Sequence, residues 1–307
     1  MSPSSVSLAP QPLSPAFRSA LELFAKREQL PASYLHTVEQ WFLPLAVDVL
    51  QRASHSRQAL LVGVSGCQGS GKTTLAQLLV LMLRELLGLK CVNLSIDDFY
   101  LTHAERQELS RTVHPLLATR GVPGTHDVQL ALDTIAALRK EGSVLIPRFN
   151  KAIDDRGPQT EWPRVQAPVD VIVLEGWCLS VGTQTHAQLE QAINSLEEQE
   201  DADGVWRKYV NERIGHEYAQ LYDAIDYLVM LKAPDFAKVF EWRQNQEDKL
   251  AAKSAGQGTR LMNREQLRRF IQHYERITRH GLETLPLKAD VVFQLTGEQM
   301  IAGKLKG

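Results

Sequence analysis

The eight residues GCQGSGKT at positions 66–73 restrict the possible folds of this chain more than any other feature. They follow the pattern of a glycine, four residues and then Gly-Lys-Ser/Thr, and they lie between a strand-like apolar run, Ala59–Ser65, and a helical pattern, Lys72–Leu87. Glycines in such a turn let successive backbone N–H groups point at phosphate oxygens, and the helix N-terminus adds a partial positive charge. The sequence therefore predicts a strand–loop–helix unit that binds the phosphates of a nucleotide.

Each position of this loop has an expected task. We expect Lys72 to reach the β and γ phosphates and to act in catalysis, and Thr73 to ligate magnesium. The expected cofactors are accordingly ATP and Mg²⁺. The predicted nucleotide-binding residues of the loop are Gly66, Gln68, Gly69, Ser70, Gly71, Lys72, Thr73 and Thr74.

Apolar runs and helical patterns alternate through the rest of the chain. Such alternation predicts parallel strands joined by crossover helices. We therefore predict an α/β fold of the P-loop nucleoside triphosphate hydrolase type, with a five-stranded parallel core sheet flanked by helices. The four strands expected after the first are Lys90–Ile96, Val169–Leu174, Ile225–Leu231 and Asp290–Leu295, and later helices are expected near 205–222, 235–252 and 264–279.

The chain before the phosphate-binding loop divides into two parts. Residues 1–14 are rich in serine and proline, which predicts a disordered tail. Helical patterns at Phe17–Leu30 and His36–Ala53 predict an N-terminal helical extension over residues 15–55. The P-loop kinase domain then covers residues 56–307.

Two stretches of this domain interrupt the alternation. Residues 112–164 are longer than an ordinary connection, which predicts a substrate-binding insertion of loops with a short strand at Val144–Phe149. Residues 249–262 are basic and contain glycine between two helices, which predicts a mobile lid loop. The acidic run Glu197–Asp203 is expected to be a solvated surface loop.

Composition narrows the class of partner. Acidic and basic residues nearly balance, with a formal net charge of −2, so no overall positive field attracts nucleic acid or an anionic membrane. The apolar runs are shorter than the roughly 20 residues that a membrane-spanning helix needs. The three cysteines lie far apart and the first residues lack a secretory pattern, so we expect a cytoplasmic protein that acts on a small molecule.

Acidic residues follow two of the expected strands. Glu175 ends the apolar run 171–174, where a kinase places a carboxylate near the metal, so it is a predicted catalytic and magnesium-binding residue. Asp97 and Asp98 follow the second strand, on the edge of a parallel sheet that faces the ligand. A kinase for an alcohol needs a carboxylate that accepts the hydroxyl proton, and either aspartate suits that task while the other orders magnesium-bound water.

Basic residues are concentrated in the expected insertion. Arg120, Arg148 and Lys151 offer the cations that an acidic acceptor would need. His114 and His126 have no partners at metal-ligand spacing and are expected to be substrate-loop or structural residues.

Taken together, these motifs resemble the plant- and fungal-type D-glycerate 3-kinases and their bacterial relatives, in the phosphoribulokinase, uridine kinase and pantothenate kinase group. The resemblance runs over about residues 36–295 and rests on the segments GCQGSGKT, DDFY at 97–100, RGVPGTHD at 120–127, PRFNK at 147–151, LEGW at 174–177, WRQNQE at 242–247 and YERIT at 274–278.

The resemblance implies transfer of a phosphoryl group from MgATP to the 3-hydroxyl of D-glycerate. It implies that Asp97 is the base, that Arg243 approaches the nucleotide phosphates, and that Arg120, Arg148 and Lys151 frame the acceptor pocket, which also includes Tyr100 and His126. The alternatives are kinases for uridine, pantothenate or a ribulose-phosphate-like acceptor and, in another class, a nucleotide-hydrolysing switch or metal-insertion chaperone.

Overall fold

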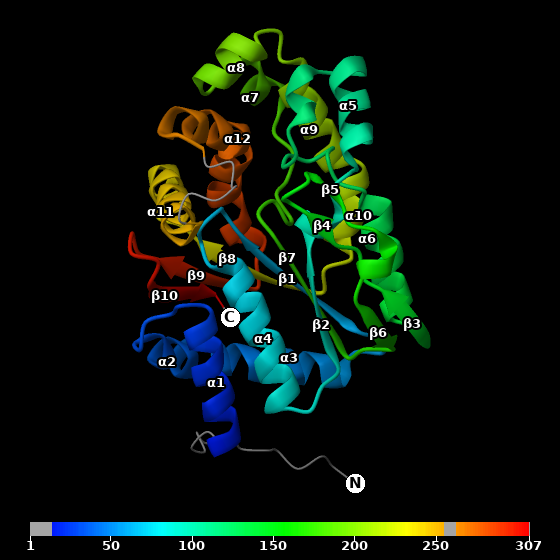
Figure 1. Ribbon diagram of the computed structural model, residues 1–307, viewed down its shortest axis with the longest axis vertical. Coiled ribbons are helices and arrows are strands. Elements are labelled where there is room, and N and C mark those ends of the chain that lie inside the picture. Colours follow the sequence, from blue (N-terminus) through cyan, green and yellow to red (C-terminus); the bar gives the residue numbers. More distant parts are fainter. Residues whose placement is uncertain (1–13, 255–261, 307) are drawn as a thin grey trace.

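The computed structural model describes residues 14–254 and 262–306, and its centre is a six-stranded sheet (Figure 1). The strand order is β10-β9-β8-β1-β7-β2. All neighbours pair in parallel except β10, which runs antiparallel to β9. The bounds are β1 Leu60–Gly66, β2 Cys91–Ser95, β7 Val171–Gly176, β8 Tyr227–Lys232, β9 Val291–Leu295 and β10 Ile301–Lys306.

The five predicted parallel strands are therefore confirmed, and the sixth was missed. β10 follows β9 after a short turn in which the N–H of Thr296 donates to the carbonyl of Met300. It lies at the edge of the sheet and pairs only with β9 among the described strands. An edge strand carries a weak apolar pattern, because only part of it is covered by other elements.

Register explains why the site forms at one edge of this sheet. Glu175 on β7 lies opposite Val64 of β1 on one side and opposite Ser95 of β2 on the other. Parallel strands in this register bring the carboxyl ends of β1, β7 and β2 together. The phosphate loop, Glu175 and the Asp97 segment therefore meet at one edge, as parallel-sheet geometry predicts.

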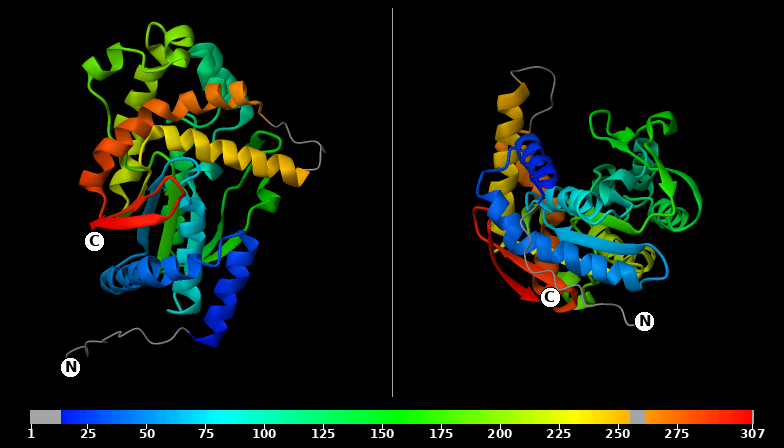
Figure 2. Two further views of the ribbon diagram at one scale, coloured as in Figure 1. Left: turned by 90° about the vertical axis from the view of Figure 1, so that its left-hand side faces the viewer. Right: turned by 90° about the horizontal axis from the view of Figure 1, so that it is seen from below.

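Helices cover both faces of the sheet, as the alternating side chains of the strands require. Leu60, Val62 and Val64 of β1 face one hydrophobic cluster, with α1, α3 and α4, whereas Leu61 faces a second cluster, with α6, α9 and α10. The long helices α11 and α12 lie side by side in both figures (Figure 2). The bounds are α1 Pro15–Arg27, α2 Tyr34–Thr37, α3 Leu43–His55, α4 Lys72–Glu85, α5 His103–Thr112, α6 Val128–Leu138, α7 His186–Glu190, α8 Ser195–Glu200, α9 Val205–Gly215, α10 Glu217–Asp223, α11 Phe236–Ser254 and α12 Arg264–Lys288.

The predicted helical extension is present as α1, α2 and α3. A π-helical turn, Val38–Phe42, joins α2 to α3, and Ser14 caps α1 by accepting a hydrogen bond from the N–H of Phe17. Apart from Ser14, the predicted disordered tail lies outside the described residues. The centre of the predicted lid, residues 255–261, also lies outside them, and residues 249–254 continue α11.

The insertion is more regular than predicted. It contains the whole of α6, which the sequence analysis did not predict, and two small antiparallel ribbons. The expected strand at Val144–Phe149 divides between them, because Gly142–Leu145 (β3) pairs with Arg164–Ala167 (β6) and Phe149–Asn150 (β4) pairs with Asp155–Arg156 (β5). Short 3₁₀ turns occur at Ile96–Phe99, Pro115–Ala118 and Gln159–Glu161.

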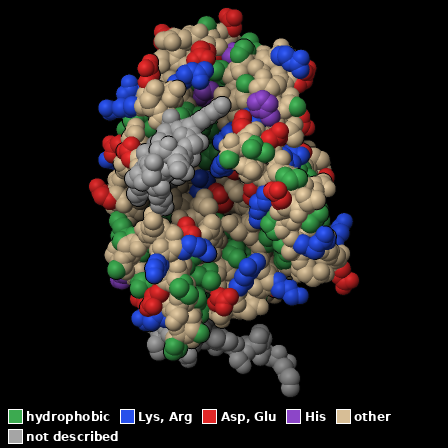
Figure 3. Space-filling view, viewed as in Figure 1, with side chains coloured by type: hydrophobic (Ala, Val, Ile, Leu, Met, Phe, Trp, Pro, Cys, Tyr) green, Lys and Arg blue, Asp and Glu red, His purple; other side chains and the backbone are tan. Residues whose placement is uncertain are grey.

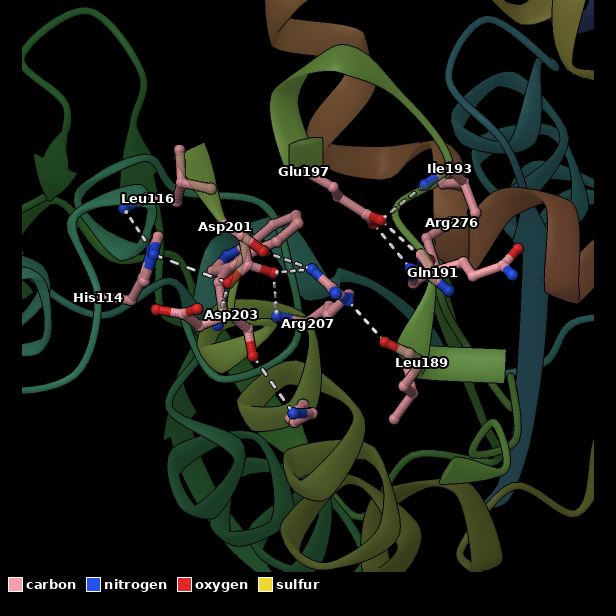
Figure 4. A network of polar contacts seen from close by, with 12 residues as sticks. His114, Leu116, Leu189, Gln191, Ile193, Glu197, Asp201, Asp203, Arg207 and Arg276 are labelled. Atoms are coloured by element: carbon pink, nitrogen blue, oxygen red, sulfur yellow. Dashed lines mark hydrogen bonds and ion pairs between the residues drawn. The ribbon is translucent and has the colours of Figure 1, made fainter. Parts of the chain in front are cut away.

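The prediction that Glu197–Asp203 is a solvated loop is wrong. The run begins within α8, and the side chains of Glu197 and Asp201 are buried (Figure 4). Arg276 of α12 donates two hydrogen bonds to the Glu197 carboxylate, at 2.7 and 2.6 Å, and Arg207 of α9 contacts Asp201 at 3.0 Å. The carboxylates are buried because arginines from later helices lie against them. None of the described helices is both long and apolar enough to cross a membrane.

Candidate active site

The phosphate loop connects β1 to α4 with two glycines in the left-handed region. Gly69 has φ +80° and Gly71 has φ +87°, a conformation that side-chain-bearing residues rarely adopt. A Cβ on Gly69 would lie 2.6 Å from the Cβ of Trp242, so this glycine also allows α11 to approach the loop. The buried Gln68 Oε1 and Ser70 Oγ have no hydrogen-bond partner among the described residues. The loop thus offers the open backbone and unsatisfied polar atoms that a phosphate chain needs.

Glu175 lies against the start of α4. Its Oε1 accepts hydrogen bonds from the hydroxyls of Thr73, at 3.1 Å, and Ser95, at 2.8 Å. Lys72 Nζ lies 3.8 Å from Oε2, which is buried and accepts no hydrogen bond from the described residues. Hydroxyl and carboxylate oxygens are the ligands that Mg²⁺ prefers, and an orphaned buried carboxylate oxygen suits a cation. Thr73 and Glu175 therefore fit the predicted metal.

Asp97 lies in the 3₁₀ turn that follows β2, between a tyrosine and a lysine. Tyr100 donates a hydrogen bond to Oδ1 at 3.0 Å, and Lys151 donates one to Oδ2 at 2.6 Å. Burial raises the pKa of Asp97, but the positive charges of Lys151 and Lys72 outweigh it and lower the pKa to about 2. The carboxylate is therefore ionised at neutral pH, as a proton acceptor must be.

Asp98 has a different environment. Its Oδ2 accepts a hydrogen bond from Arg148 at 2.8 Å, and its Oδ1 accepts one from the Phe149 N–H at 3.3 Å. Burial raises the pKa of this carboxyl. The two oxygens therefore contact Arg148 and the first residue of β4, and no hydrogen bond or ion pair of the described residues joins Asp98 to Thr73 or Glu175.

The three predicted acceptor-binding cations each pair with an aspartate. Lys151 pairs with Asp97, Arg148 with Asp98, and Arg120 with Asp154. Lys151 has the most exposed side chain of the three, at 60%. In the space-filling view the centre of this face is hollowed, and side chains of both charges gather around the hollow (Figure 3). Each of the three predicted acceptor-binding cations therefore already has a carboxylate partner.

His126 and Tyr100 form the buried side of this region. Their rings stack at 4.4 Å, and His126 Nδ1 lies 2.5 Å from the hydroxyl of Tyr218. That hydroxyl accepts a hydrogen bond from the Gly124 N–H, so its proton is free to point at Nδ1. Burial lowers the pKa of His126 to about 4, so the ring is neutral at pH 7. Tyr100 is also buried, and its pKa is raised well above the ordinary value by burial and by Asp97.

Several residues of the region were missed. Asp154 lies in the β4–β5 turn with φ +56° and pairs with the buried Arg106 as well as Arg120. Tyr274 of α12 donates a hydrogen bond to the carbonyl of Arg120 at 3.2 Å. The polar turn DDR at 154–156 was the available signal for Asp154, and the YERIT segment at 274–278 was the available signal for Tyr274.

Arg243, the predicted phosphate-contacting arginine, lies in α11, one residue after the Trp242 that packs on Gly69. It is half-buried, and its positive charge lowers the pKa of Tyr274, although burial raises that pKa overall. Arg243 of α11 and Tyr274 of α12 therefore lie close enough for the charge of one to act on the other.

Comparison with known proteins identifies the family. The sequence profile of the phosphoribulokinase/uridine kinase family matches residues 61–213. An uncharacterized kinase of Schizosaccharomyces pombe is 33% identical over 224 residues, which cover 70% of this chain and 78% of that protein. This chain belongs to the phosphoribulokinase/uridine kinase family. It is a kinase of the P-loop group, and the predicted family and fold are confirmed.

Two proteins similar to this chain have a more specific name. The chloroplastic D-glycerate 3-kinase of Arabidopsis thaliana is 35% identical over 233 residues, which cover 70% of this chain but only 46% of that protein. The chain thus spans about half the length of the plant enzyme. The structure of D-glycerate 3-kinase from Cryptococcus neoformans var. grubii superimposes with a TM-score of 0.72 and 27% identity, covering 85% of this chain and 97% of the other.

Proposed function

We propose that this kinase transfers the γ-phosphoryl group of ATP to a hydroxyl of a small hydroxy acid, with D-glycerate as the favoured acceptor and 3-phosphoglycerate as the product. The observation that carries the proposal is the ionised Asp97 beside the phosphate loop, held between Tyr100 and the exposed Lys151. The glycerate kinases among the relatives support the choice of acceptor.

The residues of the nucleotide side have distinct tasks in this proposal. Backbone N–H groups of the loop and Lys72 bind the phosphates, and Arg243 approaches them from α11. Thr73 and Glu175 hold the magnesium ion, whose charge offsets that of the β and γ phosphates when it is bound. Lys72 Nζ lies 3.8 Å from the Glu175 carboxylate that would hold the metal, so its positive charge would add to that of a bound ion.

The acceptor side positions and deprotonates the alcohol. Asp97 accepts the hydroxyl proton as the new P–O bond forms. The positive charge of Lys151 pairs with the Asp97 carboxylate before the acceptor binds. The exposed Lys151 side chain then turns toward the carboxylate of the acceptor. Arg148 and Arg120 add positive charge, and the stacked Tyr100 and His126 form the wall behind Asp97. Asp98 accepts a hydrogen bond from Arg148 and is the residue proposed to order magnesium-bound water.

An ATP-consumption screen of the purified protein tests the acceptor. D-glycerate, L-glycerate, pantothenate, uridine and ribulose 5-phosphate are compared by kcat/KM, and D-glycerate is expected to give the highest value. Higher turnover with uridine, pantothenate or ribulose 5-phosphate contradicts the choice of acceptor. Slow hydrolysis that no acceptor accelerates favours a nucleotide-operated switch or chaperone.

Two variants test the roles of the paired aspartates. Asp97→Asn is expected to lower kcat by ~100-fold or more with little change in ATP binding, because a positioned base is lost. Asp98→Asn is the matched control, and it should mainly raise the KM for the acceptor through displacement of Arg148. A larger loss of kcat in Asp98→Asn than in Asp97→Asn would move the base to Asp98.

A further inference from the structure

A cavity of about 550 Å³ opens beside the phosphate loop. Residues 69–71 and Thr74 line one end of it. Its volume lies within the roughly 300–1,000 Å³ of small-molecule sites. Two other cavities of several hundred Å³ are lined by the described residues, and neither touches the loop. A triphosphate bound at the loop therefore has this cavity beside it for the rest of the nucleotide.

The walls of this cavity come from three separate parts of the chain. Trp242 and Asn245 of α11 form one wall, the turn and start of β10 at residues 298–301 form another, and the N-terminal extension forms a third. Figure 1 shows the extension, in blue, next to the edge of the sheet that β9 and β10 form, in red. The contributions of the extension are Glu28, Leu30, Pro31, Tyr34, Thr37 and Phe42.

The chemistry of the extension's wall suits a nucleobase. Leu30, Pro31 and Tyr34 are apolar or aromatic, and the hairpin adds Met300 and Ile301 to the lining of the cavity. A nucleobase has two apolar faces and a polar edge, so it gains from apolar walls on both sides and a few oxygen acceptors at the rim. The carboxylates of Glu28 in the extension and Glu298 in the hairpin supply such acceptors.

The hairpin wall is fastened to the phosphate loop. The side-chain amide of Gln299 donates a hydrogen bond to the carbonyl of Gly69, and Trp242 Nε1 donates one to the carbonyl of Gly297 at 2.7 Å. The extension is fixed as well, because Phe17, Leu21 and other side chains of it are buried in the core. The cavity is therefore a built part of the fold.

We propose that the N-terminal helical extension forms the outer wall of the nucleoside half of the nucleotide site, with Leu30 and Tyr34 in contact with the base. The inference rests on the proposed ATP-binding function and adds a binding element to it. The family profile matches residues 61–213, so the extension lies outside the matched segment. The extension contributes to nucleotide affinity without touching the phosphates.

Calorimetry with two magnesium complexes separates base contacts from phosphate contacts. The wild-type chain should bind MgATP more tightly than magnesium tripolyphosphate. Leu30→Ala should weaken MgATP binding about tenfold, because it removes three carbons from a half-buried wall, and should leave tripolyphosphate binding unchanged. Leu23→Ala is the matched control, because Leu23 lies in α1 of the same extension, is 70% exposed and does not line the cavity.

Each result has a defined meaning. Unchanged tripolyphosphate binding shows that the loop of a variant is folded. If Leu30→Ala does not fold, Pro31→Ala replaces it, because Pro31 is an exposed turn residue on the same wall, and a two- to threefold loss of MgATP affinity is expected. Equal affinity of the wild type for both complexes, or MgATP affinity that matches wild type in a variant that still binds tripolyphosphate, overturns the inference. Failure of the wild type to bind either complex refutes the proposed function itself.

Discussion

Replacing Glu197 by alanine tests whether the α7–α8 segment is clamped by a buried ion pair. The Glu197 side chain is fully buried, and that of Arg276 is 6% exposed. The carboxylate accepts two hydrogen bonds from the guanidinium and one from the Ile193 N–H at 3.0 Å. After the replacement, Arg276 keeps the carbonyls of Gln188 and Gln191 but loses the opposite charge.

The expected cost follows from this burial. Removal of one partner of a buried pair leaves an uncompensated charge and costs ~3–5 kcal/mol, whereas an exposed pair contributes less than about 1 kcal/mol. For a chain of this size each kcal/mol lowers Tm by about 2 °C. Glu197→Ala should therefore lower Tm by ~6–10 °C. The double variant Glu197→Leu/Arg276→Met removes both charges and should recover part of the loss.

Thermal unfolding followed by circular dichroism, together with urea titration, measures these differences. Glu198→Ala is the matched control, because Glu198 is the next residue of the same helix and is exposed, and its effect should stay within ~0.5 kcal/mol. If Glu197→Ala is no less stable than Glu198→Ala, the pair is not buried in solution. If the double variant is less stable than Glu197→Ala, the loss does not come from an unpaired charge.

The remaining predictions concern the site. Lys151→Met removes the largest of the charges that lower the pKa of Asp97 to about 2, so this pKa should rise. Because the base acts only when ionised, the acid limb of kcat/KM should move to higher pH, and an acid limb that matches wild type contradicts the role of Asp97. Gly69→Ala should weaken MgATP binding more than tenfold, because backbone strain adds to the clash with Trp242. Gly88→Ala, also at positive φ but with open space around it, should bind MgATP like wild type, and equal losses in the two variants would refute the steric argument.

The sequence was sufficient for the features that local pattern controls. The glycine spacing of the phosphate loop, the apolar runs of β1 and β7 and the helical stripe of α12 each follow from contacts close in the chain, and all are present. The positions of Glu175 and Asp97 also followed, because side chains at the carboxyl ends of parallel strands meet at one edge.

Tertiary structure decided which charges are paired and which are buried. Asp97 and Asp98 are adjacent and identical in type, yet Lys151 holds one and Arg148 holds the other. The sequence alone predicts that Glu197 lies at the surface. Only the fold shows that Arg276, 79 positions later, lies against it. The sequence also does not show that residues of the extension line the cavity beside the phosphate loop. Local pattern reports only neighbours in the chain, whereas burial and ion pairing depend on residues that folding brings together.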